Sequence, residues 1–216
     1  MLLSEPLCPS NWEYEETVGY DRLLKQRNAS AAAIIRGASP HDLMRHVGDT
    51  RPSPRRLFDG LTPPHFPYFA GNYRGSALRC LDTYEVKVND DTRVGHPAAT
   101  ISLEMDAFQD LIRKALQECD YIHHVNSKIL TKENKLFRLI ELTAHAFVYF
   151  LEIHPYANGN GHMGRLILLC LLARYYIYPS NWPIHPRPAE PPYTAAIVAF
   201  RNGDKWPMIS FLLRCI

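Results

Sequence analysis

This chain of 216 residues lacks the cysteine patterns of metal-binding and secreted scaffolds. Its five cysteines, Cys8, Cys80, Cys119, Cys170 and Cys215, are widely spaced and include no C-x-x-C pair. The spacing argues against a zinc knuckle and against a dense disulfide framework. We therefore expect the protein to occupy a reducing compartment.

Export and membrane signals are also missing. The N-terminal stretch MLLSEPLCPSNWEYEE turns acidic without a basic region followed by a long apolar one, so it does not predict a signal peptide. The longest apolar segment, residues 166–178, is interrupted by Arg174 and is too short to span a bilayer. We expect a cytoplasmic protein with no membrane span.

An excess of basic charge is absent too. Lys and Arg number 24 against 22 Asp and Glu, which gives a formal charge of +2 and argues against a dedicated nucleic-acid binder. Hydrophobic residues make up 46% of the chain, enough for one full-sized globular core. Composition alone leaves most enzymes and binding modules open.

Apolar spacing predicts a mainly helical domain. Helices are expected at residues 16–36, from Ser39-Pro40 onward, and at 105–116, 135–152, about 162–177, 193–203 and 206–215. Residues 51–67 contain five prolines and are predicted to be largely loop.

One small β-hairpin is predicted among these helices. Residues 77–89 and 93–103 have an extended character, and the turn-forming cluster Asn89-Asp90-Asp91 lies between them. Pro97 indicates that one of the two strands is an exposed edge.

The stretch HPYANGNGHMGR, from His154 to Arg165, joins two of the apolar helices. Its glycines allow several backbone N–H groups to turn toward one point, beside the positive end of the following helix. Arg165 lies one turn into that helix and can bind a phosphate with two donors. His154 precedes the loop and can accept a proton near neutral pH. Together these groups predict a site for phosphoryl or nucleotidyl transfer.

Simpler interpretations of the same residues exist. Asn-Gly pairs are common turn formers, so the loop by itself is also consistent with a tight connection between helices. A histidine before proline is often structural, and an arginine in a first helical turn often faces solvent. A calcium loop is disfavoured because the stretch contains no acidic residue.

The stretch resembles the signature of the Fic family, H-P-F-x-[D/E/N]-G-N-G-R-x-x-R. His154, Pro155, Gly159, Asn160, Gly161 and Arg165 match, and Tyr156 replaces Phe. FAGNYRGS at 69–76, RVGHPAATISL at the position of the family's flap, and the helices from Tyr193 to Leu212 are also similar. The resemblance covers roughly residues 20–216. It implies an N-terminal extension at 1–20 and a single Fic domain at 21–216, mainly α with a small β-hairpin flap.

The resemblance also implies an activity. Fic proteins typically transfer AMP from ATP to a Ser, Thr or Tyr hydroxyl of a target protein and release pyrophosphate. His154 would take the hydroxyl proton. The backbone of Gly159 to Gly161, with the Asn160 side chain, would hold the α- and β-phosphates, and Arg165 would bind the terminal phosphate. The donor would be ATP with Mg²⁺ or Mn²⁺. The target would add a β-strand to the flap at Pro97, Ala98, Ala99, Thr100 and Ile101.

Two positions depart from the pattern. Asn158 stands where Asp or Glu usually holds the metal, so weaker metal binding is expected. His162 stands where the family usually has its first Arg, and a neutral imidazole cannot replace that cation in phosphate binding. Activity would then be reduced, pH-dependent or redirected to another donor. The simpler alternative is that His162 caps the helix and points outward.

The sequence is also consistent with other functions. The chain could transfer UMP, phosphocholine or phosphate, or it could be a catalytically weakened module that binds nucleotides or proteins. The family's inhibitory pattern [S/T]-x-x-x-E-[G/N] is absent. The only Glu-Asn pair is Glu133-Asn134, and the residue four positions before Glu133 is Ile129, where the pattern requires Ser or Thr. Any brake is therefore expected from a separate, antitoxin-like chain. Export as a bacterial effector and the oligomeric state are not settled by the sequence.

Overall fold

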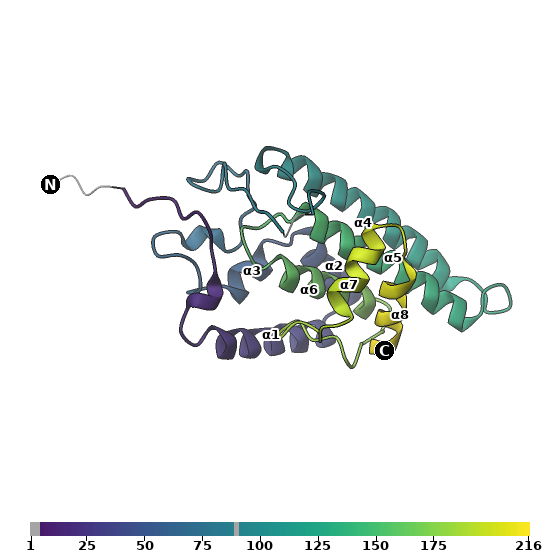
Figure 1. The fold of residues 1–216 in the computed structure, drawn as a ribbon. Helices are drawn as coiled ribbons and strands as arrows, with labels where there is room; N and C mark the ends of the chain where they lie inside the picture. Colours follow the sequence, from purple (N-terminus) through teal and green to yellow (C-terminus); the bar gives the residue numbers. More distant parts are fainter. Residues whose placement is uncertain (1–4, 89–90) are drawn as a thin grey trace.

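A computed structural model describes residues 5–88 and 91–216, and within them the chain folds into eight α-helices (Figure 1). Three short 3₁₀ turns, at Tyr14–Glu16, Pro67–Phe69 and Ala98–Thr100, connect or precede the helices. The helices are α1 Tyr20–Gly37, α2 Pro40–Gly48, α3 Pro52–Leu57, α4 Ile101–His124, α5 Lys132–Ile153, α6 Asn160–Ala173, α7 Tyr193–Arg201 and α8 Trp206–Cys215.

Local capping explains where several helices begin. The Ser39 hydroxyl accepts the N–H of Asp42 at 3.2 Å, and Pro40 occupies the first turn of α2. Thr131 caps α5 in the same way, accepting the N–H of Asn134 at 3.3 Å. Each predicted helix is confirmed by a helix of the structure, although α4 is much longer than the expected 105–116.

The centre of the molecule is the antiparallel pair α5 and α6. α5 packs against α4, α6 and α8, while α6 also contacts α1 and α2 (Figure 1). Every residue of α6 except Gly161 is buried, as expected for a helix that is apolar on all sides. Neither α6 nor any other helix of the described residues is both long and apolar enough to cross a membrane. The loop between these two helices is thus anchored at both ends in the core.

The predicted β-hairpin flap is wrong for the residues that the structure describes. Residues 77–88 and 91–97 form turns and irregular chain with no strand, and Asn89 and Asp90 lie outside the described residues. The backbone N–H groups of Gly95 and His96 bond instead to the carbonyls of Glu152 and Ile153, at 2.8 and 3.3 Å. Pairing with the end of α5 replaces pairing within a hairpin.

Pro97 precedes a helix and does not lie in the predicted edge strand. Residues Ala98–Thr100 form a 3₁₀ turn that continues into α4 at Ile101. The proline ring fixes a φ that suits the entry to a helix as well as an edge strand, so its presence alone does not distinguish the two.

The proline-rich segment 51–67 also differs from the prediction, because residues Pro52–Leu57 form α3. Pro52 lies in the first turn of α3, where the missing N–H costs nothing. The remainder of the segment is loop, as expected.

The N-terminal segment is attached to the domain by several contacts. Cys8 and Cys80 form a disulfide, whereas Cys119, Cys170 and Cys215 are free and buried. The indole N–H of Trp12 donates to the carbonyl of Leu61 at 2.8 Å, and its ring is buried. The cysteine spacing did not indicate this bond, since its two partners are 72 residues apart.

Candidate active site

A cleft of about 560 Å³ opens where α5 ends and α6 begins. Its floor is the loop from His154 to Gly161 and the first turns of α6. Its walls come from the N-terminal segment, α1, the segment between α6 and α7, and α7 itself. The polar and charged wall residues include Tyr14, Asp21, His185, Arg187, Tyr193 and Arg201. Almost all of the residues selected from the motif therefore share one cavity.

His154 is held in one orientation and one tautomer. It caps α5 in the left-handed conformation, with φ 52°, and its Nδ1 lies 2.6 Å from the carbonyl oxygen of Leu151. Since a carbonyl only accepts hydrogen bonds, Nδ1 carries the proton and Nε2 presents a lone pair. Burial, with a smaller contribution from Arg74 and Arg201, lowers the pKa of His154 from 6.5 to about 4. His154 is thus a neutral proton acceptor at physiological pH.

Arg74 fixes the backbone of His154, a role that the sequence did not reveal. Its side chain is fully buried, and its Nε and Nη2 donate to the His154 carbonyl at 2.9 and 2.8 Å. The same guanidinium bonds to the carbonyls of Tyr84 and His96 and forms an ion pair with Glu85 at 3.4 Å. Arg74 belongs to the FAGNYRGS segment, so the resemblance marked the segment without indicating the contact.

The loop after His154 is closed by Asn160. Its Oδ1 accepts the N–H of Tyr156 at 2.9 Å, and its Nδ2 donates to the Tyr156 carbonyl at 2.8 Å. Both polar atoms of the side chain are therefore engaged within the loop. The predicted phosphate contact from the Asn160 side chain stays a prediction, and the backbone N–H groups of the loop are the donors left to make it.

Gly159 is required at the turn into α6. Its φ of 80° is unfavourable for other residues, and a Cβ there would lie 2.3 Å from Cε2 of Phe58. Gly161, one residue inside α6, lies under the Arg165 guanidinium, whose Nη1 would be 3.1 Å from an added Cβ. Gly159 therefore lets the turn pass the Phe58 ring, and Gly161 lets the backbone approach the Arg165 cation closely.

Arg165 is buried and held by neutral partners. Its Nε donates to the carbonyl of Ile184 at 2.9 Å, and its Nη1 lies 3.4 Å from the hydroxyl of Tyr193. Within residues 5–88 and 91–216, Arg165 forms no ion pair with a carboxylate. The charge of Arg165, together with the N-terminus of α6, makes this end of the cleft suited to an anion.

His162 does not point outward, as the simpler interpretation proposed. Its side chain is only 5% exposed, and its Nε2 lies 3.0 Å from Nδ1 of His185. The rings of Tyr14 and Phe58 contact it edge-on, with centroids 5.8 and 5.5 Å away. Burial, then the charges of Arg165 and His185, lower its pKa from 6.5 to about 2. His162 is therefore neutral in this structure.

Asn158, the position predicted to hold a metal, has both polar atoms of its side chain hydrogen-bonded. Asn158, the predicted ligand, donates its Nδ2 to the carbonyl of Trp12, and its Oδ1 accepts the N–H of Gly159, both at 2.6 Å. No group of three His, Cys, Asp or Glu side chains able to hold a metal occurs in the described parts of the chain. Asn158 acts here as a link between the loop and the N-terminal segment.

The predicted docking residues lie at the start of α4. Ala98 and Ile101 are buried, whereas Pro97 and Ala99 are exposed. A helical backbone cannot pair with an added strand, so the prediction that a target strand pairs with residues 97–101 is wrong for this structure. Val88 and Asp91, on either side of the two undescribed residues, line the cleft instead.

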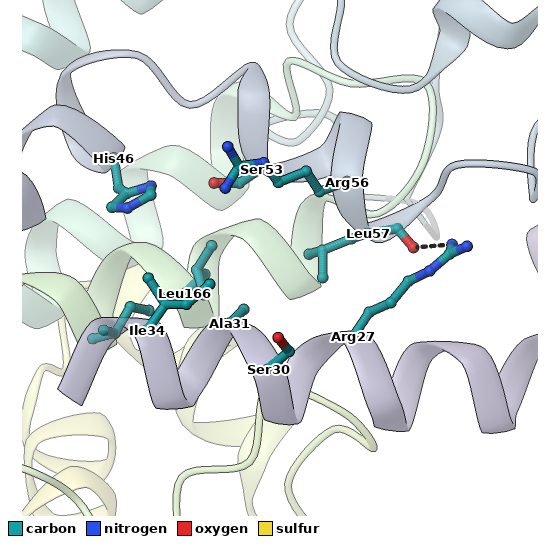
Figure 2. Close-up of a pocket in the computed structure, with 10 residues that line it drawn as sticks. Arg27, Ser30, Ala31, Ile34, His46, Ser53, Arg56, Leu57 and Leu166 are labelled. Carbon is teal, nitrogen blue, oxygen red and sulfur yellow. Dashed lines mark hydrogen bonds between the residues drawn. The ribbon is translucent and has the colours of Figure 1, made fainter. Parts of the chain in front are cut away.

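A second cavity, of about 150 Å³, is distinct from the cleft (Figure 2). It is mostly apolar and lies between α1, α3 and Leu166 of α6, with Arg27 donating to the Leu57 carbonyl at its edge. It contains neither His154 nor Arg165, and its polar lining residues include His46, Ser53 and Arg56.

Comparison with known proteins assigns the chain to a family. A sequence model of the Fic/DOC family matches residues 56–172, which is more than half of the chain. The match includes Arg74, His154 and Arg165, and it ends within α6. No curated protein matches the chain.

Proposed function

The chain belongs to the Fic/DOC family, and from this premise we propose that it transfers AMP from ATP to a Ser, Thr or Tyr hydroxyl of a target protein. Membership supports a Fic-type transferase that moves a nucleotide or a phosphate group. The choice of AMP is our proposal, and it rests on the arrangement of His154 beside an anion-binding helix end.

The observation that carries the proposal is the state of His154. The Nδ1–H bond to Leu151 leaves Nε2 free to accept a proton, and a pKa of about 4 keeps the ring neutral. In the proposed step, Nε2 removes the proton of the target hydroxyl as its oxygen attacks the α-phosphorus. The bond from that phosphorus to the β-phosphate oxygen breaks, and pyrophosphate leaves.

The phosphates would bind at the start of α6. The backbone N–H groups of Asn160 and Gly161 and the dipole of α6 favour negative charge, and Arg165 adds a full positive charge, whereas the N–H of Gly159 already donates to Asn158. We propose that Mg²⁺ or Mn²⁺ enters bound to the phosphates of the nucleotide. The target would contact the rim near Val88 and Asp91.

A second candidate is transfer of another group, such as UMP, phosphocholine or phosphate. The neutral His162 favours it, because one cation of the usual phosphate site is missing. The same feature is compatible with a catalytically weakened module that binds a nucleotide or a protein.

Label transfer distinguishes these functions. The purified chain is incubated with cell lysate and ATP or UTP labelled at the α-phosphate, with Mg²⁺ or Mn²⁺. Transfer from ATP is expected, and His154→Ala should lower it about 100-fold or more, the usual contribution of a general base. His41→Ala, which changes an exposed histidine on α2, is the matched control. Transfer that survives His154→Ala unchanged would contradict the mechanism.

We also propose that any inhibition comes from a separate chain. The inhibitory pattern is absent from the sequence, and Arg165 has no carboxylate partner among the described residues. A partner that supplies a carboxylate to Arg165 would block the anion site. Co-purification from the native host, followed by label transfer with and without the partner, tests this.

A further inference from the structure

A hydrogen-bonded chain of three residues leads from the cleft to its outer wall. Nε2 of His162 lies 3.0 Å from Nδ1 of His185, and Nε2 of His185 lies 3.0 Å from Oδ1 of Asp21. The three residues come from α6, from the segment between α6 and α7, and from α1. Lys25 pairs with the other oxygen of Asp21 at 2.8 Å and so keeps the carboxylate ionised.

These hydrogen bonds determine which nitrogen of His162 carries the proton. An ionised carboxylate only accepts hydrogen bonds, so His185 donates from Nε2 to Asp21, and a neutral His185 then carries its lone pair on Nδ1 and accepts there. His162 must then donate from Nε2, which leaves a lone pair on its Nδ1. Nδ1 of His162 has no hydrogen-bond partner among the described residues. In this state His162 offers an acceptor, which repels a phosphate oxygen.

His162 nevertheless lies inside the anion-binding end of the cleft. It is one helical turn from Arg165, and both side chains line the cavity at the N-terminus of α6. A neutral imidazole with a free lone pair at this place leaves the anion site incomplete. One added proton on Nδ1 would complete it, because an imidazolium donates from both nitrogens.

We propose that His162 is a proton-coupled ligand for the polyphosphate part of the donor. When phosphate enters the cleft, Nδ1 of His162 takes one proton from solvent and donates it in a hydrogen bond to a phosphate oxygen. The new bond is Nδ1–H, the solvent acid loses that proton, and no electrons are exchanged. His185 and Asp21 are positioning residues that hold the opposite side of the ring. This inference deepens the proposed function and rests on it.

The charges around His162 explain why an anion is needed. Burial and the nearby Arg165 keep the ring neutral, with a pKa of about 2. A negative charge about 4 Å away raises an imidazole's pKa by about three for each unit charge, at the effective dielectric of a protein site. Pyrophosphate carries several such charges, which brings protonation into the working pH range. The other titratable or charged groups that line the cavity are Tyr14, Glu15, Tyr20, Asp91, His154, Arg187, Tyr193 and Arg201.

Calorimetric titration with inorganic pyrophosphate tests the proposal. Binding is measured between about pH 5.5 and pH 7.5 in two buffers of different ionisation enthalpy, which reports the protons taken up per ligand. The wild-type chain should take up more protons than His162→Gln, and its affinity should rise by up to about tenfold per pH unit as the pH falls. His162→Arg should bind about tenfold more tightly than wild type near pH 7.5, with little pH dependence. Protonation of pyrophosphate itself affects all three proteins equally.

Equal proton uptake by the wild-type chain and His162→Gln would overturn the proposal. If the variants do not fold, nitrogen-15 NMR of the wild-type histidines gives the same answer. Pyrophosphate should convert one imidazole with a free Nδ1 into an imidazolium, and no change would refute the idea. Asp21→Asn should reduce the proton uptake, which a purely structural role of Asp21 would leave unchanged.

The binding test separates this inference from the proposed function. Pyrophosphate binding requires neither target protein nor transfer. If label transfer fails while proton uptake is observed, AMP transfer is wrong and the proton-coupled anion site stands. If transfer occurs without proton uptake at His162, the function stands and this inference falls.

Discussion

Arg74 donates two hydrogen bonds to the carbonyl oxygen of His154, across 80 residues of sequence, and thereby holds the proposed general base from behind. The contact is to the backbone, so it sets the position of the residue and leaves the imidazole free. Arg74 as a whole is 1% exposed, and its charge is only partly balanced by Glu85, whose side chain is largely exposed. Burial lowers its pKa to about 10, so Arg74 remains charged at physiological pH.

Replacing Arg74 should therefore reduce both stability and transfer. Arg74→Lys keeps a charge but cannot reach the carbonyls of Tyr84, His96 and His154 at once. We expect a loss of about 3–5 kcal/mol in the free energy of unfolding, the usual cost of breaking a buried charged network. Urea denaturation measures the loss, and Arg79→Lys, an exposed arginine nearby in the chain, is the control. A variant of unchanged stability would show that the network is dispensable.

Gly159→Ala should destabilise the loop. A side chain at φ 80° is strained, and its Cβ would overlap the Phe58 ring at 2.3 Å. We expect a loss of at least about 2 kcal/mol and much weaker pyrophosphate binding. Gly37→Ala is the matched control, because Gly37 ends α1 with open space around it and no left-handed φ. Comparable stability losses in the two variants would contradict the role given to Gly159.

The stability of the empty chain should fall below about pH 6.5. His154 and His162 have pKa values of about 4 and about 2 in the folded chain, against 6.5 when unfolded. Between pH 6.5 and the folded-state pKa of each histidine, the unfolded chain binds more protons than the folded chain. The stability contributed by each histidine is therefore fully present above about pH 6.5 and decreases as the pH falls. Each histidine contributes about 1.4 kcal/mol per pH unit within its window. Denaturation of wild type and His162→Gln from about pH 7 to pH 4.5 measures the slope, which should be shallower in the variant.

Reduction of Cys8–Cys80 should loosen the N-terminal segment. The bond closes a loop of 72 residues, which the chain-entropy description values at about 4 kcal/mol. Denaturation with and without dithiothreitol should show this loss in wild type and no response in Cys8→Ser. Because disulfides persist in oxidising compartments, thiol labelling of the protein from its native host also tests the expected cytoplasmic location. A fully reduced Cys8 and Cys80 would support the cytoplasm.

Asn158→Asp should weaken the same segment. Asp retains an acceptor for the Gly159 N–H but loses the donor to the Trp12 carbonyl, and places a negative charge beside that oxygen. We expect a loss of about 1–3 kcal/mol that Mg²⁺ does not restore. Asn181→Asp, at an exposed position, is the control. Restoration of stability by Mg²⁺ would instead favour a metal-binding role for this position.

The local patterns predicted the helices and the centre of the site. Apolar spacing located all of the longer helices because burial of a helix face depends on residues three and four apart. The cap formed by Ser39-Pro40 and the turn formed by Gly-Asn-Gly likewise depend only on residues close by in the sequence. The hairpin prediction failed because the N–H groups of Gly95 and His96 found acceptors at the end of α5, far away in the sequence.

The sequence by itself therefore determined the helical class, the loop from His154 to Arg165 and the family resemblance. Only the tertiary structure decided the partners of that loop: Arg74 behind His154, His185 and Asp21 behind His162, and Trp12 beside Asn158. The physical reason is that hydrogen bonds between distant residues depend on how the helices pack. No local periodicity encodes which buried donor meets which acceptor.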